Sequence, residues 1–132
     1  MPHQEKTILV IEDERPLIGA ISAKLEKEGL AVVTARTVDQ ALGYLHDLPS
    51  VDAVWLDHYL LGQADGLDFV AKVKADGSHW KHIPIFVVTN TASPENRLSY
   101  IHFGVEKYYV KSEHRLDEIV QAIKTFLTHP ET

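Results

Sequence analysis

Five apolar runs of strand length alternate along the chain with five stretches that have helical periodicity. The runs lie at residues 7–12, 30–35, 51–57, 83–89 and 105–111. Runs with little polar alternation are typical of strands buried on both faces of a parallel sheet. Helices between consecutive strands would cover those two faces. The pattern therefore predicts an α/β fold, with five βα units wound on both sides of a five-stranded parallel sheet.

Local signals predict where several of the helices begin. Pro16 is expected at the first position of the helix that follows the first run. The segment Thr37–Gln40 fits a capping box, and Ser93–Pro94 combines a capping serine with a proline at the first helical position. The pair Asp65–Gly66 is a turn signal. These features support helices between the strands rather than long irregular loops.

The composition fits one domain, which we expect to span residues 1–132. With 132 residues, 45% of them hydrophobic, the chain can bury a core without disulfides, and it contains no cysteine. No apolar run approaches the roughly 18 residues that suggest a membrane span, so we expect no membrane contact and a cytoplasmic location. The net charge of −6 argues against nucleic acid as a direct partner.

Side chains that can carry chemistry stand at the ends of four of the five runs. Glu12 ends the first run with Asp13 directly after it, and Asp57 ends the third. Thr89 ends the fourth run and Lys111 ends the fifth. In open parallel sheets, ligands bind at the carboxyl ends of the strands, near a switch in strand order. We therefore expect these five side chains to converge at one edge of the sheet.

The predicted cluster needs a cation. Carboxylates at close range raise one another's pKa unless positive charge lies among them. Oxygen donors without histidine or cysteine suit Mg²⁺, which takes one or two carboxylates together with waters and a phosphate. Taken singly, Glu12 and Asp13 could be the acidic first turn of a helix, and Asp57 a turn residue. Their conjunction instead favours a site with Mg²⁺ on one side of Asp57 and Lys111 on the other.

With an acid pair, an aspartate, a threonine and a lysine at the ends of these runs, the chain resembles the receiver domains of bacterial two-component response regulators, from about residue 6 to residue 128. The matching motifs are "ILVIEDE" (8–14), "VWLDHYLLG" (54–62), "PIFVVTN" (84–90) and "GVEKYYVKS" (104–112). The resemblance implies the flavodoxin-like, CheY-like receiver fold with strand order 2-1-3-4-5. The order of the strands is taken from the resemblance alone.

The resemblance also implies a phosphoryl-acceptor site. Asp57 would accept a phosphoryl group from a phosphohistidine of a sensor histidine kinase or a phosphotransfer protein. Glu12, Asp13, Asp57 and the backbone carbonyl of Tyr59 would hold Mg²⁺. The chain would catalyse only its own phosphorylation and dephosphorylation, and is not expected to be an enzyme otherwise. His58, directly after Asp57, is interpreted as a structural residue.

A switch is implied beside the acceptor. Lys111 and the hydroxyl of Thr89 would contact the phosphoryl group, and Tyr108 would change rotamer as Thr89 moves. About 5.5 kcal/mol of differential binding moves an equilibrium from 1:99 to 99:1. Two or three charge-assisted hydrogen bonds of about 1.5–3 kcal/mol each would supply most of this. The output face for a downstream protein target of unknown identity would be residues 93–128.

Two departures from the family pattern leave an alternative open. Ser112 replaces the usual proline after Lys111, and a cis bond before a non-proline residue costs about 2.5–4 kcal/mol, so the isomer of the Lys111–Ser112 bond is left open. Asn90 is bulkier than the usual small residue. A pseudo-receiver, a phosphorylation-independent interaction module of the same fold, is therefore the alternative. An aspartyl-phosphate phosphatase would need a second acid where Tyr59 stands, and a flavin-binding fold would need a phosphate loop after the first strand.

Overall fold

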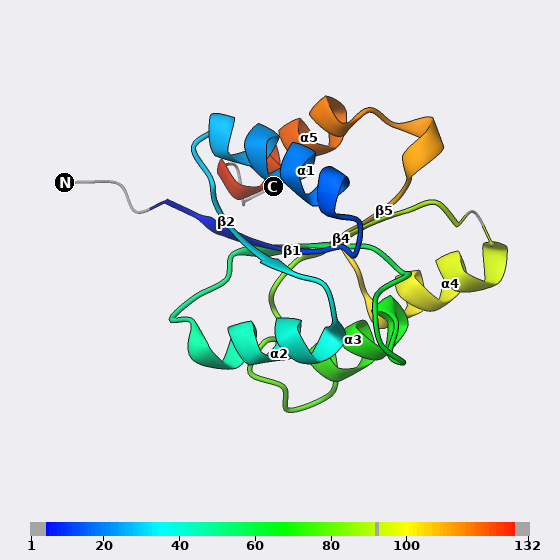
Figure 1. Cartoon of the computed structure of the whole chain (residues 1–132). Helices are drawn as coiled ribbons and strands as arrows, with labels where there is room; N and C mark the ends of the chain where they lie inside the picture. Colours follow the sequence, from blue (N-terminus) through cyan, green and yellow to red (C-terminus); the bar gives the residue numbers. More distant parts are fainter. Residues whose placement is uncertain (1–4, 92, 129–132) are drawn as a thin grey trace.

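The computed structural model describes residues 5–91 and 93–128 as a parallel sheet covered by helices (Figure 1). The strand order is β2-β1-β3-β4-β5, which confirms both the predicted fold class and the predicted order. The strands are β1 (Thr7–Ile11), β2 (Ala31–Ala35), β3 (Ala53–Leu56), β4 (Ile85–Thr89) and β5 (Lys107–Val110). The helices are α1 (Arg15–Lys27), α2 (Val38–Asp47), α3 (Gly66–Val73), α4 (Pro94–Phe103) and α5 (Leu116–Thr128).

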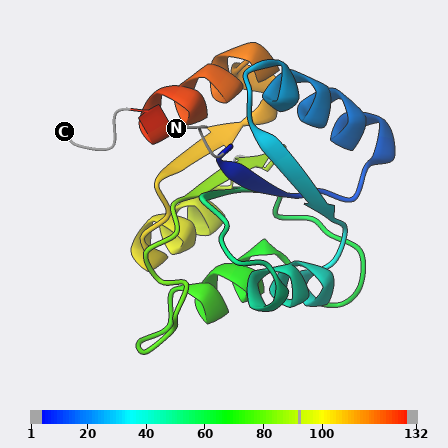
Figure 2. The same ribbon diagram turned by 90° about the vertical axis from the view of Figure 1, so that its left-hand side faces the viewer.

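The helices form one layer on each face of the sheet (Figures 1 and 2). Helices α1 and α5 pack on one face over side chains that include Trp55 and Phe86. Helices α2, α3 and α4 pack on the other face over Leu9, Val54 and Val87. Because β1, β3 and β4 are covered on both sides, nearly all of their residues are buried, which explains their continuous apolar runs.

One helix start and one predicted capping box differ from the sequence-based prediction. Helix α1 begins at Arg15, so Pro16 occupies the second helical position and not the first. The hydroxyl of Thr37 accepts the Gln40 N–H (3.0 Å), as a capping box requires. The Gln40 amide oxygen, however, accepts the N–H of Arg36 (2.9 Å) and not that of Thr37. Its side chain reaches one residue further back, so only half of the predicted box forms.

The complete capping box belongs to α3. Asp65 accepts the N–H of Asp68 (3.1 Å), and Asp68 accepts the N–H of Asp65 (2.8 Å). The Asp65–Gly66 pair was predicted as a turn, but Asp65 is the capping residue and Gly66 is the first residue of the helix. This box fixes the point at which the loop after β3 enters α3.

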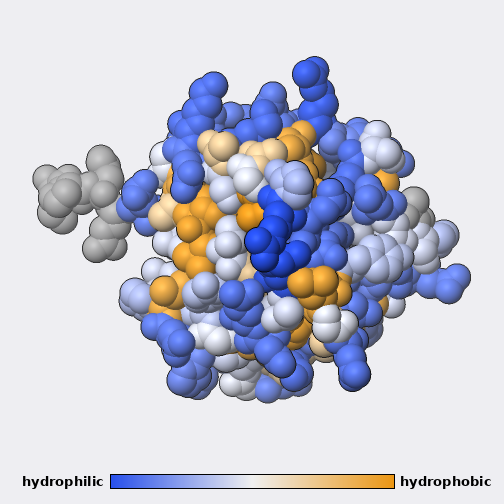
Figure 3. Space-filling view, viewed as in Figure 1, coloured by the Kyte–Doolittle hydropathy of each residue, from blue (hydrophilic) through white to orange (hydrophobic). Residues whose placement is uncertain are grey.

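The face of the molecule shown in Figure 3 is mostly hydrophilic, with separate apolar patches. Among the described residues, the large hydrophobic side chains left exposed include Leu98 and Ile101 on α4 and Leu61 after β3. None of the helices in the described ranges has the length and apolar character needed to span a bilayer.

Candidate functional site

The carboxyl ends of β1 and β3 bring three carboxylates together. Ile11 and Leu56, the last residues of these strands, are register partners. Glu12 and Asp57 come directly after them, and the Asp57 N–H donates to the Ile11 carbonyl (2.9 Å). Glu12, Asp13 and Asp57 each offer an oxygen within 4.8 Å of the others. The structure thus places the predicted acid pair beside the predicted acceptor.

Lys111 completes the charge arrangement. Its Nζ lies 3.0 Å from Glu12 Oε1 and 3.4 Å from Asp57 Oδ2, with little of its side chain exposed. Burial disfavours the charged ammonium, but the carboxylates of Asp57 and Glu12 outweigh it and raise the pKa of Lys111. No peptide bond in the described ranges is cis, so the Lys111–Ser112 bond, whose isomer the sequence left open, is trans. The lysine reaches both carboxylates with this geometry.

The buried carboxyl group of Glu12 has a strongly shifted pKa. Burial and then the charge of Asp57 raise the pKa of Glu12 from 4.5 to about 7, although Lys111 and the Glu14 N–H act in the opposite direction. Glu12 Oε2 accepts the N–H groups of Asp13 (3.1 Å) and Glu14 (3.2 Å), which fix its orientation. Three clustered oxygen donors with excess negative charge fit a hard divalent cation such as Mg²⁺.

Thr89 and Tyr108 meet at the backbone of Thr91. Thr89 is fully buried at the end of β4, and its hydroxyl accepts the Thr91 N–H (3.4 Å). The Tyr108 hydroxyl donates to the Thr91 carbonyl (2.8 Å). Arg97 lies over the Tyr108 ring, 5.6 Å from its centroid. The two residues predicted as a switch therefore contact the same segment between β4 and α4.

The loop between β3 and α3 adds a backbone contact to the acceptor. The N–H of His58 donates to Asp57 Oδ1 (2.8 Å), so each carboxylate oxygen of Asp57 has its own partner. Tyr59 follows in the same loop with its side chain mostly exposed. The role of its carbonyl as a metal ligand stays a prediction.

Sequence reasoning missed Arg36, which connects two loops of the site. Its guanidinium donates twice to the Asp13 carbonyl, from Nε (3.1 Å) and Nη2 (2.7 Å). Its own carbonyl accepts the N–H of Leu61 (3.1 Å). Arg36 directly follows the last residue of β2, which was the one strand of the five without a predicted site residue at its end. The charged side chain of Arg36 was the signal at that position. The same strand-end rule would have found it.

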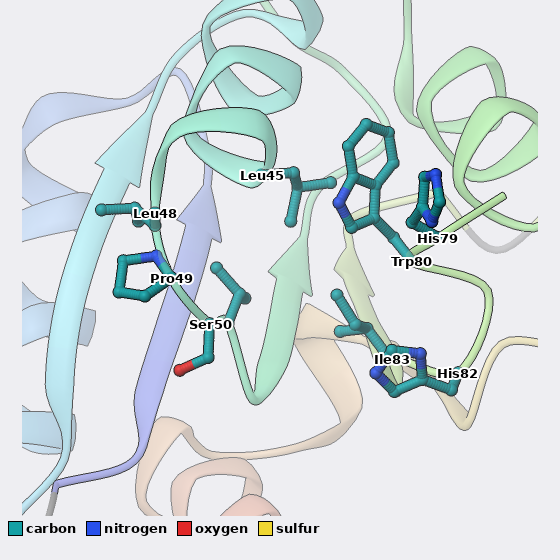
Figure 4. A pocket seen from close by; sticks show the side chains of 9 residues that line it. Leu45, Leu48, Pro49, Ser50, His79, Trp80, His82 and Ile83 are labelled. Carbon is teal, nitrogen blue, oxygen red and sulfur yellow. The ribbon is translucent and has the colours of Figure 1, made fainter.

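A cavity of about 280 Å³ lies at the opposite, amino-terminal edge of the sheet (Figure 4). It separates the end of α2 from the segment that precedes β4. Its lining consists of Leu45, Leu48, Pro49, Ser50, Val51, His79, Trp80, His82 and Ile83. Since Val51 precedes β3 and Asp57 follows it, the cavity and the acidic site lie at opposite ends of that strand.

A parallel sheet in this order, with an acid cluster and a lysine at its carboxyl edge, is the arrangement of a CheY-like receiver. The chain belongs to the response regulator receiver domain family, whose model matches residues 8–124. It is thus the receiver domain of a two-component response regulator.

Relatives and solved structures agree with this assignment. The chain is 31% identical over 106 residues to the phosphate regulon transcriptional regulatory protein PhoB of Escherichia coli K12, covering 80% of this chain and 45% of PhoB. It is 29% identical over 104 residues to the transcriptional regulatory protein CpxR of the same organism. The chain therefore spans less than half of the length of these relatives.

Two response regulators from the solved structures share the fold over almost the whole chain. The phosphorylated cyanobacterial phytochrome response regulator RcpA superposes with a TM-score of 0.85 at 27% identity, covering 98% of both chains. The Mn²⁺-bound response regulator Rcp1 superposes with a TM-score of 0.82 at 23% identity, covering 96% of this chain and 97% of Rcp1. The second likeness concerns the fold alone.

Proposed function

We propose that this receiver accepts a phosphoryl group on Asp57 from a phosphohistidine of a sensor histidine kinase or a phosphotransfer protein. The observation that carries the proposal is the position of the Asp57 carboxylate, buried between the Lys111 ammonium and the acid pair Glu12 and Asp13. The similarity to RcpA, which is known in a phosphorylated form, supports it.

The chain's own groups would act mainly by position and charge. An oxygen of Asp57 attacks phosphorus as the bond to the histidine nitrogen breaks, and the electron pair and then a proton go to that nitrogen. The His58 N–H holds Asp57 Oδ1 and so fixes the plane of the carboxylate. Lys111 and the Thr89 hydroxyl would donate to phosphoryl oxygens. Mg²⁺, held by Glu12, Asp13 and Asp57, would neutralise charge on the transferring group.

The partners would be proteins. We propose that the phosphoryl donor docks at the acidic site and that a downstream target binds the face formed by α4, β5 and α5, within residues 93–128. Leu98 and Ile101 of α4, which are 66% and 53% exposed, offer apolar contacts there. Beyond its own phosphorylation and dephosphorylation, no catalytic activity is proposed for the chain.

Incubation with acetyl phosphate and Mg²⁺ is expected to add one phosphoryl group to the wild-type protein and none to Asp57→Asn. The substitution keeps the shape of the side chain and removes the nucleophilic carboxylate. Intact-mass spectrometry with and without Mg²⁺ measures the result. An unchanged mass for the wild type, with acetyl phosphate and with a panel of phosphorylated histidine kinases, would support the pseudo-receiver instead.

Mg²⁺ affinity is expected to fall as the pH decreases from about 8 to about 6, since a proton competes with the metal at Glu12. The pKa of Glu12 is about 7 in the folded protein and 4.5 ordinarily. Between pH 4.5 and about 7, Glu12 therefore holds a proton in the metal-free folded state but has lost it in the unfolded state. The free energy of unfolding of the metal-free protein decreases as the pH rises through this range. Calorimetric titration with Mg²⁺ at several pH values tests this, with Glu12→Gln expected to flatten the profile. A flat profile in the wild-type protein would contradict it.

A further inference from the structure

Helix α4 reaches the loop after β3 through a buried tyrosine. The hydroxyl of Tyr100, a fully buried residue, forms a hydrogen bond with Nδ1 of His58 (2.7 Å). His58 is itself only 7% exposed and directly follows Asp57. The bond joins residues that are 42 positions apart in the sequence, and the function proposed above assigns a role to neither side chain.

The Tyr100 hydroxyl lies where this loop closes. The Gly66 N–H donates to the His58 carbonyl (2.9 Å), which closes the loop of residues 58–66. The hydroxyl lies so close to Gly66 that a Cβ atom there would come near it. Tyr100 therefore contacts both ends of the loop that carries the Tyr59 carbonyl.

The polar groups of this contact satisfy one another. His58 Nε2 faces Asp65 Oδ2 at 3.8 Å, on the opposite side of the ring from the bond to Tyr100. Burial, followed by the charge of Asp65, raises the pKa of Tyr100 well above its ordinary value, so its hydroxyl stays protonated within this contact. A buried hydroxyl that lost its partner would be costly, so α4 and the loop are held together.

We propose that Tyr100 and His58 are positioning residues, whose hydrogen bond fixes the loop of residues 58–66 for binding of Mg²⁺ and the phosphoryl group. The inference rests on the proposed function. The bond holds the loop in which His58 fixes Asp57 through its N–H, and in which the Tyr59 carbonyl is the expected metal ligand. Because binding linkage is reciprocal, a partner that shifts α4 would change Mg²⁺ affinity by the same factor that Mg²⁺ changes partner affinity.

The test is a double-mutant cycle on Mg²⁺ affinity, measured by calorimetry with Mg²⁺ alone. Tyr100→Phe and His58→Leu are each expected to weaken Mg²⁺ binding by about three- to tenfold, which is the effect of losing one hydrogen bond. The double variant is expected to lose no more Mg²⁺ affinity than either single variant, because both substitutions remove the same bond. His58→Asn keeps a polar atom near the position of Nδ1 and is expected to retain most of the affinity. In the Tyr100→Phe background, His58→Asn and His58→Leu should bind equally.

A matched control comes from the other face of the sheet. Tyr109 is half-buried and its ring contacts His114, with 5.0 Å between the ring centroids. Tyr109→Phe is expected to leave Mg²⁺ affinity unchanged. Unfolding free energies, measured in parallel, separate a loss of positioning from a loss of folded protein. Unchanged affinity in Tyr100→Phe, or additive losses in the double variant, would overturn the proposal.

Hydrogen exchange of the Gly66 amide in metal-free protein separates this inference from the proposed function. Tyr100→Phe is expected to speed that exchange several-fold, while Tyr109→Phe is not, whether or not Mg²⁺ binds. Failure of the wild type to bind Mg²⁺ would overturn the proposed function and the metal-positioning part of the inference. Unchanged exchange at Gly66 would overturn the loop-fixing part even in a protein that binds Mg²⁺ and becomes phosphorylated.

Discussion

Replacing Gly66 with alanine is expected to lower the free energy of unfolding by about 1–3 kcal/mol, the usual cost of overpacking a filled site. A Cβ atom at Gly66 would lie 2.9 Å from the Asp57 carbonyl oxygen and 3.0 Å from His58 Cα, besides its contact with the Tyr100 hydroxyl. The backbone atoms cannot move away without displacing the acceptor residue itself. The same variant is therefore expected to accept a phosphoryl group more slowly.

Gly43→Ala is the matched control for Gly66→Ala. Gly43 also lies in a helix, but nothing lies within 4 Å of a Cβ atom placed there. Because alanine has the higher helix propensity, Gly43→Ala is expected to raise the stability by about 0.5–1 kcal/mol. Urea unfolding of both variants measures the contrast. Equal stabilities for the two variants would show that the structure around Gly66 relaxes freely.

Lys111→Met is expected to slow phosphorylation by acetyl phosphate by about 10²–10³-fold, the typical loss when one preorganised charge-stabilising group is removed. The ammonium lies within 3.4 Å of both Glu12 and Asp57, and no other lysine or arginine in the described ranges forms an ion pair with either carboxylate. Its loss leaves the two buried carboxyl groups facing each other. Methionine keeps the length and the apolar stem of the side chain.

Lys107→Met provides the comparison for Lys111→Met, because Lys107 is an exposed residue of the same strand, β5. The Lys107→Met substitution changes the net charge by the same amount but lies outside the acidic site. The phosphorylation rate of this variant is expected to match that of the wild type. Quenched-flow or gel-based rates at saturating Mg²⁺ give the comparison. A Lys111→Met rate within a few-fold of the wild-type rate would refute the proposed role of the lysine.

The sheet could be predicted from the sequence because strands that are buried on both faces consist of continuous apolar runs. The runs at 7–12, 51–57 and 83–89 correspond to β1, β3 and β4, with ends that differ by no more than two residues. Helix starts were harder, since Gln40 can reach either of two neighbouring N–H groups and only the folded geometry selects that of Arg36. The strand order came from the family resemblance and not from the periodicity.

The positions of the candidate site residues follow from topology. Carboxyl ends of parallel strands share one edge, so the strand pattern alone predicts that Glu12, Asp13 and Asp57 lie together, as they do in the structure. The contact between His58 and Tyr100 could not be predicted in this way. Sequence periodicity predicts helices and strands, but it does not indicate which loop residue contacts which helix residue when the two are far apart in the sequence.

The two helical layers pack on separate apolar cores, divided by the sheet. The core under α2, α3 and α4 includes Tyr100, which holds the loop beside Asp57, whereas the core under α1 and α5 includes Trp55 and Phe86. Only the strands belong to both. A substitution that repacks the core under α1 and α5 is therefore expected to leave the packing of Tyr100 and of the loop of residues 58–66 unchanged, because these lie on the other face of the sheet.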